Sequence, residues 1–331
     1  MVKRNSEGET KVATKIHLPK ESDGTLRCLK LPEDLAKDLL ERKNAHIHDP
    51  YITFRERDHA YWIKGDALYI VSSTTFIHQF FSEFDAERIV GYILRSKKWS
   101  TDRSYKYYMM TKQQILDSWE LNRDTAANAG TRLHADIEYH YNGLDHLVTN
   151  DSYEYRTLFQ QFKDDHSEMV MYRTEQMIYS SVLKITGSID AISKNSDGTL
   201  TLIDWKRSKK INFKAFGNKR GLEPFDHLPD CNFTHYQLQL NLYRTILETF
   251  YGEIVREMYL VVLHPDQDRY LKIIIPRMET EGHLLFEFRR QQLIEKGLLD
   301  DVEESEHYYF KTEGDLFHPD KTPIFPQLCR Q

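Results

Sequence analysis

The stretch Leu183–Lys206, LKITGSIDAISKNSDGTLTLIDWK, decides the fold because it contains two β-type apolar runs around one tight turn. The turn is Asn195-Ser196-Asp197-Gly198, and Asp-Gly supplies the positive φ that a tight hairpin turn needs. We therefore predict antiparallel strands over 183–193 and 199–206. Side chains alternate between the two faces of a strand, so the hairpin also determines which polar residues come together.

The segments on either side of the hairpin extend this sheet. Further strands are predicted at 174–181, 256–263 and 270–275. Helices are predicted at 124–141, 153–169, 234–250 and 278–296. This order of elements predicts an α/β protein with a mixed central sheet flanked by helices.

The N-terminal part has a different pattern. Residues 1–24 are polar and mixed in charge, and we expect a flexible tail there. A short helix is predicted from Leu31 to about Lys43, and β-rich runs at 51–54, 60–63 and 67–71 predict a small antiparallel sheet. We therefore divide the chain into the tail at 1–24, an N-terminal α+β region at 25–120, and a core at 121–331 that includes a C-terminal helix.

Composition excludes several classes of protein. The chain has 331 residues and a formal net charge of −6, so any contact with nucleic acid must use a local basic patch. The longest unbroken apolar run is Met258–Leu263, far short of the roughly 20 residues of a membrane span, and no membrane partner is expected.

The cysteines and the N-terminus indicate a compartment. Cys28, Cys231 and Cys329 are far apart and form no CxxC pair, which argues against a disulfide scaffold, a zinc ribbon or a four-cysteine iron–sulfur cluster. The first residues lack the apolar stretch of a secretory signal. We expect an intracellular protein in a reducing compartment.

The hairpin brings three chemically competent side chains together. Asp204 and Lys206 point the same way on their strand, and the turn returns Asp190 beside them. Carboxylate oxygens are hard ligands that suit Mg²⁺ or Mn²⁺, and a lysine ammonium stabilises charge that develops on a phosphate. A cross-strand ion pair on a solvated sheet explains the same residues equally well.

Two helical segments add further candidates. His134 and Glu138 are four residues apart and share one helix face, although a lone helical histidine is more often structural than a ligand. Gln239 and Tyr243 have the same spacing and could present an amide and a phenol to a substrate backbone. An amphipathic helix with polar ends is the plainer explanation of that second pair.

Together, and in this order, these pieces resemble the RecB-type nuclease branch of the PD-(D/E)XK superfamily. The matching motifs are Gly130…His134, Gly187…Asp190, Asp204…Lys206 and Gln239…Tyr243, within about residues 125–265. The run Ser72–Phe81 with Phe84-Asp85 is also similar to nucleases of large DNA viruses, which leaves open a viral protein acting in a host cell. Three scattered cysteines cannot hold an iron–sulfur cluster, so the closer likeness is to cluster-free members such as the mitochondrial genome maintenance exonucleases.

The resemblance implies a restriction-endonuclease-like core and a role for each matching residue. It implies metal ligation by His134, Asp190, Asp204 and the Trp205 carbonyl, for one or two Mg²⁺ or Mn²⁺ ions. It makes Lys206 the catalytic lysine, with Asp190 and Asp204 in the same catalytic set. Gln239 and Tyr243 would position the DNA strand or the lysine. Glu175 is either a ligand for a second metal or a surface strand glutamate.

A basic segment follows the catalytic lysine. Residues 206–220 contain seven basic and no acidic residues, with Phe213 and Phe216 between them. Such a segment can follow a phosphate backbone and stack bases, or be a solvated basic loop. Its candidate nucleic-acid-binding residues are Arg207, Lys209, Lys210, Lys214, Lys219 and Arg220.

The function expected from residues and resemblance is metal-dependent hydrolysis of DNA phosphodiester bonds. We expect an exonuclease on single-stranded DNA or DNA ends, in replication, repair or recombination and beside proteins of those processes. Two alternatives stay open: a structure-specific or RNA endonuclease of the same superfamily, and a catalytically silent DNA-binding scaffold, since a fold alone does not prove activity.

Overall fold

The structure is a computed structural model that describes residues 39–55, 57, 60–149 and 152–299. The tail expected at 1–24, Cys28 and Cys329 lie outside the described residues. The helices and strands, in chain order, are α2 (Leu39–Lys43), β1 (Ile52–Arg55), β2 (Ala60–Ile63), β3 (Val71–Ser72), α3 (Ser73–His78), α4 (Ala86–Arg95), α5 (Lys97–Thr101), α6 (Lys112–Tyr141), η3 (Glu154–Phe159), α7 (Gln160–Asp165), β4 (Met171–Ser180), β5 (Ile185–Lys194), β6 (Leu200–Lys206), α8 (Asn232–Ile246), η5 (Leu247–Tyr251), β7 (Val255–Val262), β8 (Leu271–Ile274) and α9 (Glu279–Glu295). Short 3₁₀ turns, η1 (Asp49–Tyr51), η2 (Asp145–Leu147) and η4 (Phe216–Asn218), complete the described elements.

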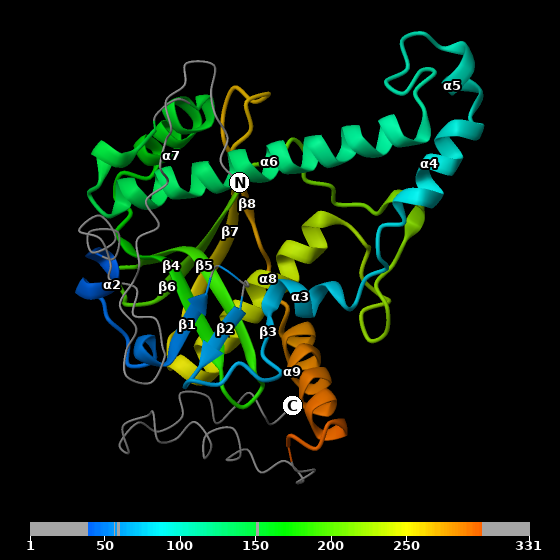
Figure 1. Cartoon of the computed structure of the whole chain (residues 1–331). Helices are drawn as coiled ribbons and strands as arrows, with labels where there is room; N and C mark the ends of the chain where they lie inside the picture. Colours follow the sequence, from blue (N-terminus) through cyan, green and yellow to red (C-terminus); the bar gives the residue numbers. More distant parts are fainter. Residues whose placement is uncertain (1–38, 56, 58–59, 150–151, 300–331) are drawn as a thin grey trace, which may run out of the picture.

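The centre of the molecule is a mixed sheet of six strands with helices on both faces (Figure 1). The strand order is β3-β5-β6-β7-β8, and β4 pairs with β5. The pairs β4–β5, β5–β6 and β7–β8 are antiparallel, whereas β3–β5 and β6–β7 are parallel. The expected mixed α/β class, with a mixed central sheet flanked by helices, is confirmed.

The two faces of the sheet bury separate cores. Ile203 and Trp205 of β6 pack with α6, η3 and α7, whereas Leu202 packs with α8 and α9 on the other face. Every residue of β6 from Leu200 to Trp205 is buried, as expected for a central strand covered on both sides. Packing on both faces thus fixes the position of the strand that carries Asp204 and Lys206.

The N-terminal sheet is smaller than the sequence predicted. β1 and β2 pair antiparallel as expected, but the third run at 67–71 does not join them. The backbone at Tyr69 is left-handed, with φ of +61°, and this interrupts an extended strand. Arg289 holds the segment in that position by donating to the Tyr69 carbonyl at 2.6 Å. The chain becomes extended only at β3, which pairs with β5 in the central sheet.

The expected boundary between residues 120 and 121 falls inside α6. The helix begins at Lys112, twelve residues before the predicted start, because Thr111 and Gln114 form a reciprocal capping box. Phe76 of α3 is fully buried in the same core as β5 and α8. The segments before and after residue 120 therefore share one core.

Two further sequence expectations concern the surroundings of the chain. Among the described residues, no helix is both long enough and apolar enough to cross a membrane. Cys231, the cysteine that the structure describes, is buried and forms no disulfide there.

Candidate active site

The site lies where β5 loses a strand partner along one edge. β5 pairs with β3 through Ile185 and Thr186, and with β6 only from Ala191 onward. At Asp190, where this ladder ends, a side chain replaces the backbone bond, because the Trp205 N–H donates to Asp190 Oδ2 at 2.9 Å. At the fork between the strands the Asp190 carboxylate thus satisfies the Trp205 N–H, and the Asp190 side chain is 13% exposed.

A glycine allows α8 to approach β5 closely at this fork. A Cβ atom on Gly187 would lie 2.3 Å from Cε1 of Tyr243 and 2.9 Å from Oγ of Ser73. Real Cβ atoms essentially never show contacts below 3.0 Å. The absence of a side chain at Gly187 thus allows the Tyr243 ring to pack beside the strand that carries Asp190.

The neighbouring strand contributes Glu175 in an unusual backbone conformation. Glu175 lies opposite Asp190, between the register pairs Gln176–Ile189 and Thr174–Ala191. Its φ of +46° is in the left-handed region, which is costly for a residue with a side chain and recurs at functional sites. Ser188 donates to Glu175 Oε2 at 3.0 Å and so orients the carboxylate.

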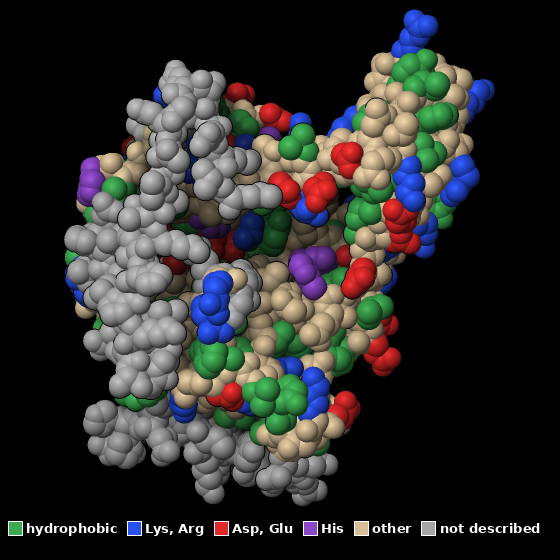
Figure 2. Space-filling view, in the orientation of Figure 1, with side chains coloured by type: hydrophobic (Ala, Val, Ile, Leu, Met, Phe, Trp, Pro, Cys, Tyr) green, Lys and Arg blue, Asp and Glu red, His purple; other side chains and the backbone are tan. Residues whose placement is uncertain are grey.

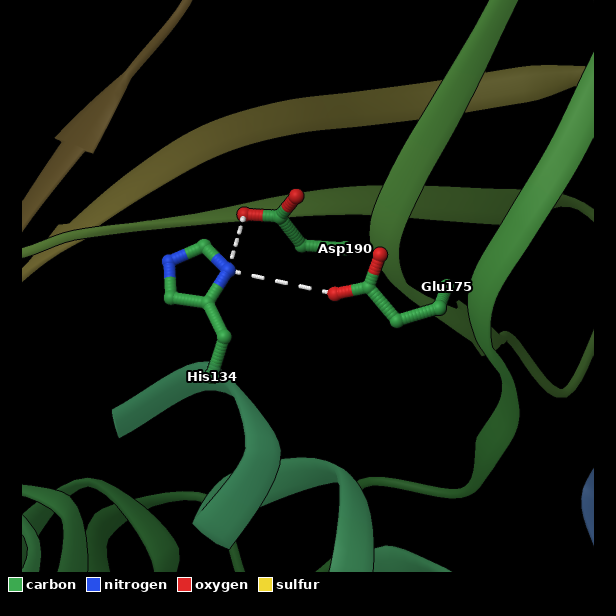
Figure 3. A group of neighbouring side chains, drawn as sticks. All are labelled: His134, Glu175 and Asp190. Atoms are coloured by element: carbon green, nitrogen blue, oxygen red, sulfur yellow. Dashed lines mark ion pairs between the residues drawn. The ribbon is translucent and has the colours of Figure 1, made fainter. Parts of the chain in front are cut away.

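His134 of α6 completes a three-residue cluster with these carboxylates (Figure 3). Its Nδ1 lies 3.6 Å from Asp190 Oδ2 and 3.8 Å from Glu175 Oε1. The three candidate ligand atoms lie within 4.8 Å of one another. The other ring nitrogen, Nε2, is 3.0 Å from the Trp205 carbonyl oxygen, which can accept its proton in a hydrogen bond. Nδ1 then faces the carboxylates, where it carries a proton in the charged ring and offers a lone pair once that proton leaves.

The electrostatics of the cluster favour a positive charge at its centre. Burial lowers the pKa of His134, but Asp190 and Glu175 outweigh it and raise the pKa to about 9. Burial raises the pKa of Asp190. Burial and mutual repulsion make it unfavourable for both carboxyl groups to be ionised, and the imidazole keeps its proton beside them. A bound cation would stabilise the ionised carboxylates of this site.

Asp204 and Lys206 form a pair beside this cluster. Their carboxylate and ammonium are 2.5 Å apart, as expected from strand alternation, and Asp204 is nearly inaccessible. Burial raises the pKa of Asp204 to about 6. Burial alone would lower the pKa of Lys206, but Asp204 and Asp190 raise it above its ordinary value. Asp204 thus contacts the lysine and lies outside the three-residue group formed by His134.

Sequence reasoning missed Tyr236, whose ring centroid is 5.1 Å from the Lys206 ammonium. It is a cation–π contact that limits where the lysine can lie. The signal was available, since Tyr236 is seven residues before Tyr243 and therefore on the same face of α8.

Gln239 and Tyr243 do share a face, because the Gln239 amide donates to the Tyr243 hydroxyl at 2.8 Å. The same amide nitrogen lies 3.5 Å from Oγ1 of Thr74, in the Ser72–Phe81 run. Burial raises the pKa of Tyr243 well above its ordinary value, so the phenol keeps its proton at neutral pH. Figure 2 shows a hollow below α6 in which basic, acidic and histidine side chains are visible.

Three cations of the basic segment after Lys206 have polar partners. Arg207 pairs with Glu154 at 2.5 Å and Lys209 with Asp266 at 2.6 Å. Arg220 donates to the His227 carbonyl at 2.8 Å. Lys209 and Arg220 are nevertheless exposed, as are Lys210, Lys214, Lys219 and the aromatic rings of Phe213 and Phe216, whereas Ile211 is buried.

Comparison with known proteins gives little further information. No protein-family model matches the chain, and no curated protein matches it significantly. The solved structure of SSO0001 is 15% identical, with 85% of this chain and 94% of that chain covered and a TM-score of 0.30. A protein named "Putative exonuclease" from Eubacterium rectale is 9% identical, with 52% and 69% covered and a TM-score of 0.34. At these TM-scores neither likeness supports a conclusion about this chain.

Proposed function

We propose that the protein is a metal-dependent nuclease that hydrolyses DNA phosphodiester bonds. One observation carries the proposal: the ligand atoms of His134, Glu175 and Asp190 lie within 4.8 Å of one another, beside the Asp204–Lys206 pair. The motif order that resembles RecB-type nucleases of the PD-(D/E)XK superfamily supports the same reading.

The donor set fits a divalent cation. One imidazole nitrogen and two carboxylate oxygens suit Mn²⁺ or Mg²⁺, and the left-handed backbone at Glu175 directs a second carboxylate into the same space. Asp204 and the Trp205 carbonyl remain further candidate ligands, as the resemblance implies. When bound, the cation lowers the pKa of a water molecule and offsets charge on the phosphate.

The chain's own residues have distinct tasks in this proposal. Lys206 keeps its proton because Asp204 and Asp190 raise its pKa, so it acts as a fixed positive charge beside the phosphate. Asp204 and the Tyr236 ring hold the ammonium in place. The protonated Tyr243 hydroxyl orients the Gln239 amide, which is then available to a phosphate or sugar oxygen of the strand.

The substrate class follows from charge. A chain with net charge −6 carries seven basic residues in the segment 206–220, and five of them are exposed: Lys209, Lys210, Lys214, Lys219 and Arg220. Exposed Phe213 and Phe216 offer rings on which unstacked bases can stack. These features favour single-stranded DNA or DNA ends, and an exonuclease, over a duplex read by its grooves.

The test is cleavage of single-stranded DNA labelled at either end, in Mn²⁺, Mg²⁺ or chelator. Wild type is compared with Asp190→Asn, Lys206→Met and the control Lys194→Met, a lysine at the other end of the sheet. We expect metal-dependent cleavage, at least as fast in Mn²⁺ as in Mg²⁺, that both site variants lose and the control retains. Cleavage of a circular strand would assign an endonuclease instead. Binding without cleavage of any DNA or RNA would leave a silent scaffold.

A further inference from the structure

A helical arm projects from the sheet at the end of α6 opposite to the cluster (Figure 1). We define the arm as residues 84–119, which include α4, α5 and the start of α6. Its tip is tied together, because Met109 N–H donates to the Trp99 carbonyl at 3.0 Å and the Trp99 indole donates to the Met110 carbonyl at 2.9 Å. The Trp119 indole donates to the Tyr107 hydroxyl at 2.8 Å and fixes the tip to α6. These hydrogen bonds hold the arm in a defined conformation.

The arm carries a concentration of positive charge in an acidic chain. Within the arm seven side chains are basic and four are acidic (Asp85, Glu87, Asp102 and Asp117), and between residues 88 and 112 only Asp102 is acidic. The seven are Arg88, Arg95, Lys97, Lys98, Arg103, Lys106 and Lys112, and all are exposed. Within the described part of the chain only Lys112 of these forms an ion pair, with Glu87. Figure 2 shows basic side chains along the arm, where Tyr92 is also 56% exposed.

We propose that the arm is a second contact for the phosphate backbone of the nucleic acid whose cleaved bond lies at His134. This inference rests on the function proposed above. Charge complementarity selects a polyanion, and α6 connects the two contacts as one helix. His134 follows Lys112 by 22 residues, which at 1.5 Å per residue separates the contacts by about 33 Å. At about 3.4 Å per nucleotide, that distance spans about ten nucleotides of a B-form strand.

The geometry thus assigns the arm to long substrates only. A strand of four nucleotides extends about 14 Å at this rise, and even at twice the rise its reach of about 27 Å is short of the roughly 33 Å between the contacts, whereas one of thirty extends about 100 Å. Affinity for long strands should therefore contain a salt-dependent part that short strands lack. The rate at which short strands are cleaved at the His134 cluster should not depend on the arm.

The test measures binding of dT4 and dT30 in chelator over a range of salt concentrations. The arm variant is K97Q/K98Q/R103Q, and the control with the same charge change is K194Q/R256Q/K296Q. Removing three phosphate contacts should reduce the slope of log K against log salt by about 2 for dT30, at about 0.7 per contact on a single strand. The control should keep the wild-type slope, and dT4 should bind all three proteins alike.

Three results would overturn the inference. One is an unchanged slope on dT30, and another is an equal loss of affinity for dT4 and dT30. The third is unchanged DNA binding with loss of binding to phosphatidylserine vesicles, which would assign the arm to a membrane surface. Failure of the proposed function is seen separately, since wild type would then bind dT30 yet cleave no strand in Mn²⁺.

Discussion

The close packing of α8 on β5 predicts that Gly187→Ala is destabilising although alanine is small. The backbone at Gly187 is not among the left-handed positions, so the cost of the substitution is steric. The new Cβ would lie 2.3 Å from Tyr243 Cε1, and Tyr243 is 3% exposed in a packed core. Overpacking of this kind costs about 1–3 kcal/mol. We expect the free energy of unfolding to fall by about 2 kcal/mol.

Thermal and urea unfolding measure this cost directly. A loss of about 2 kcal/mol lowers Tm by about 4–8 °C in a domain of this size. Gly130→Ala is the matched control, because a Cβ there meets nothing within 4 Å and alanine favours the interior of a helix. That control should be neutral or stabilising. The shifted Tyr243 ring should also weaken its bond to Gln239, so cleavage should fall more than stability alone explains.

A double-mutant cycle tests the proposed cause. Tyr243→Leu removes the atom that the new methyl meets, so Gly187→Ala should cost at least about 1 kcal/mol less in that background, within the coupling range of neighbours in contact. Tyr243→Phe keeps Cε1 and should give no such relief. Additive free energies in the leucine background would refute the steric argument.

Three other predictions follow from charge. Because the pKa of His134 is about 9, a metal that binds Nδ1 displaces a proton at neutral pH. The affinity for Mn²⁺ should therefore rise by up to about tenfold per pH unit between pH 6 and pH 8. Calorimetry of His134→Gln should show no such rise. The double variant K210Q/K214Q should lower the slope of log K against log salt for DNA binding by about 1.4. Adding K209Q should lower it by less than either of these substitutions, because Lys209 already pairs with Asp266. Equal slopes in wild type and K210Q/K214Q would contradict a role of this segment in DNA binding. Burial lowers the pKa of His48 from 6.5 to about 3. Between these two pH values the unfolded chain binds a proton at His48 and the folded chain does not. Stability should therefore fall with acid by up to about 1.4 kcal/mol per pH unit, and the pH series of urea unfolding should be flatter for His48→Leu.

Local patterns predicted the hairpin and the pairs it contains. The Asp-Gly turn and alternation along β6 are short-range effects, and they place Asp204 against Lys206 within one strand. The spacing of Gln239 and Tyr243 likewise needs only helical geometry, and the two side chains are bonded. Contacts between residues that are close in the chain could therefore be predicted from the sequence without knowledge of the fold.

Features that depend on distant partners could not be predicted in this way. The turn at Tyr69 is held by Arg289, 220 residues away, so the local β-type pattern at 67–71 was misleading. The left-handed backbone at Glu175 has no sequence signal, since no glycine or asparagine marks it. The early start of α6 was encoded by the capping residues Thr111 and Gln114, but its consequence, a projecting arm, required the packing around Trp99.

Charge balance explains why these residues suit a divalent cation. Glu175, Asp190 and Asp204 bring three formal negative charges into one partly buried space, and Lys206 offsets one of them. A proton on His134 supplies a second positive charge, which is why the pKa of that imidazole rises to about 9 despite burial. One negative charge is still unbalanced. Replacing that proton by a doubly charged ion brings the sum to zero, whereas a singly charged ion would leave it unchanged. The elevated pKa of His134 therefore reflects the field that would draw a divalent metal to the same nitrogen.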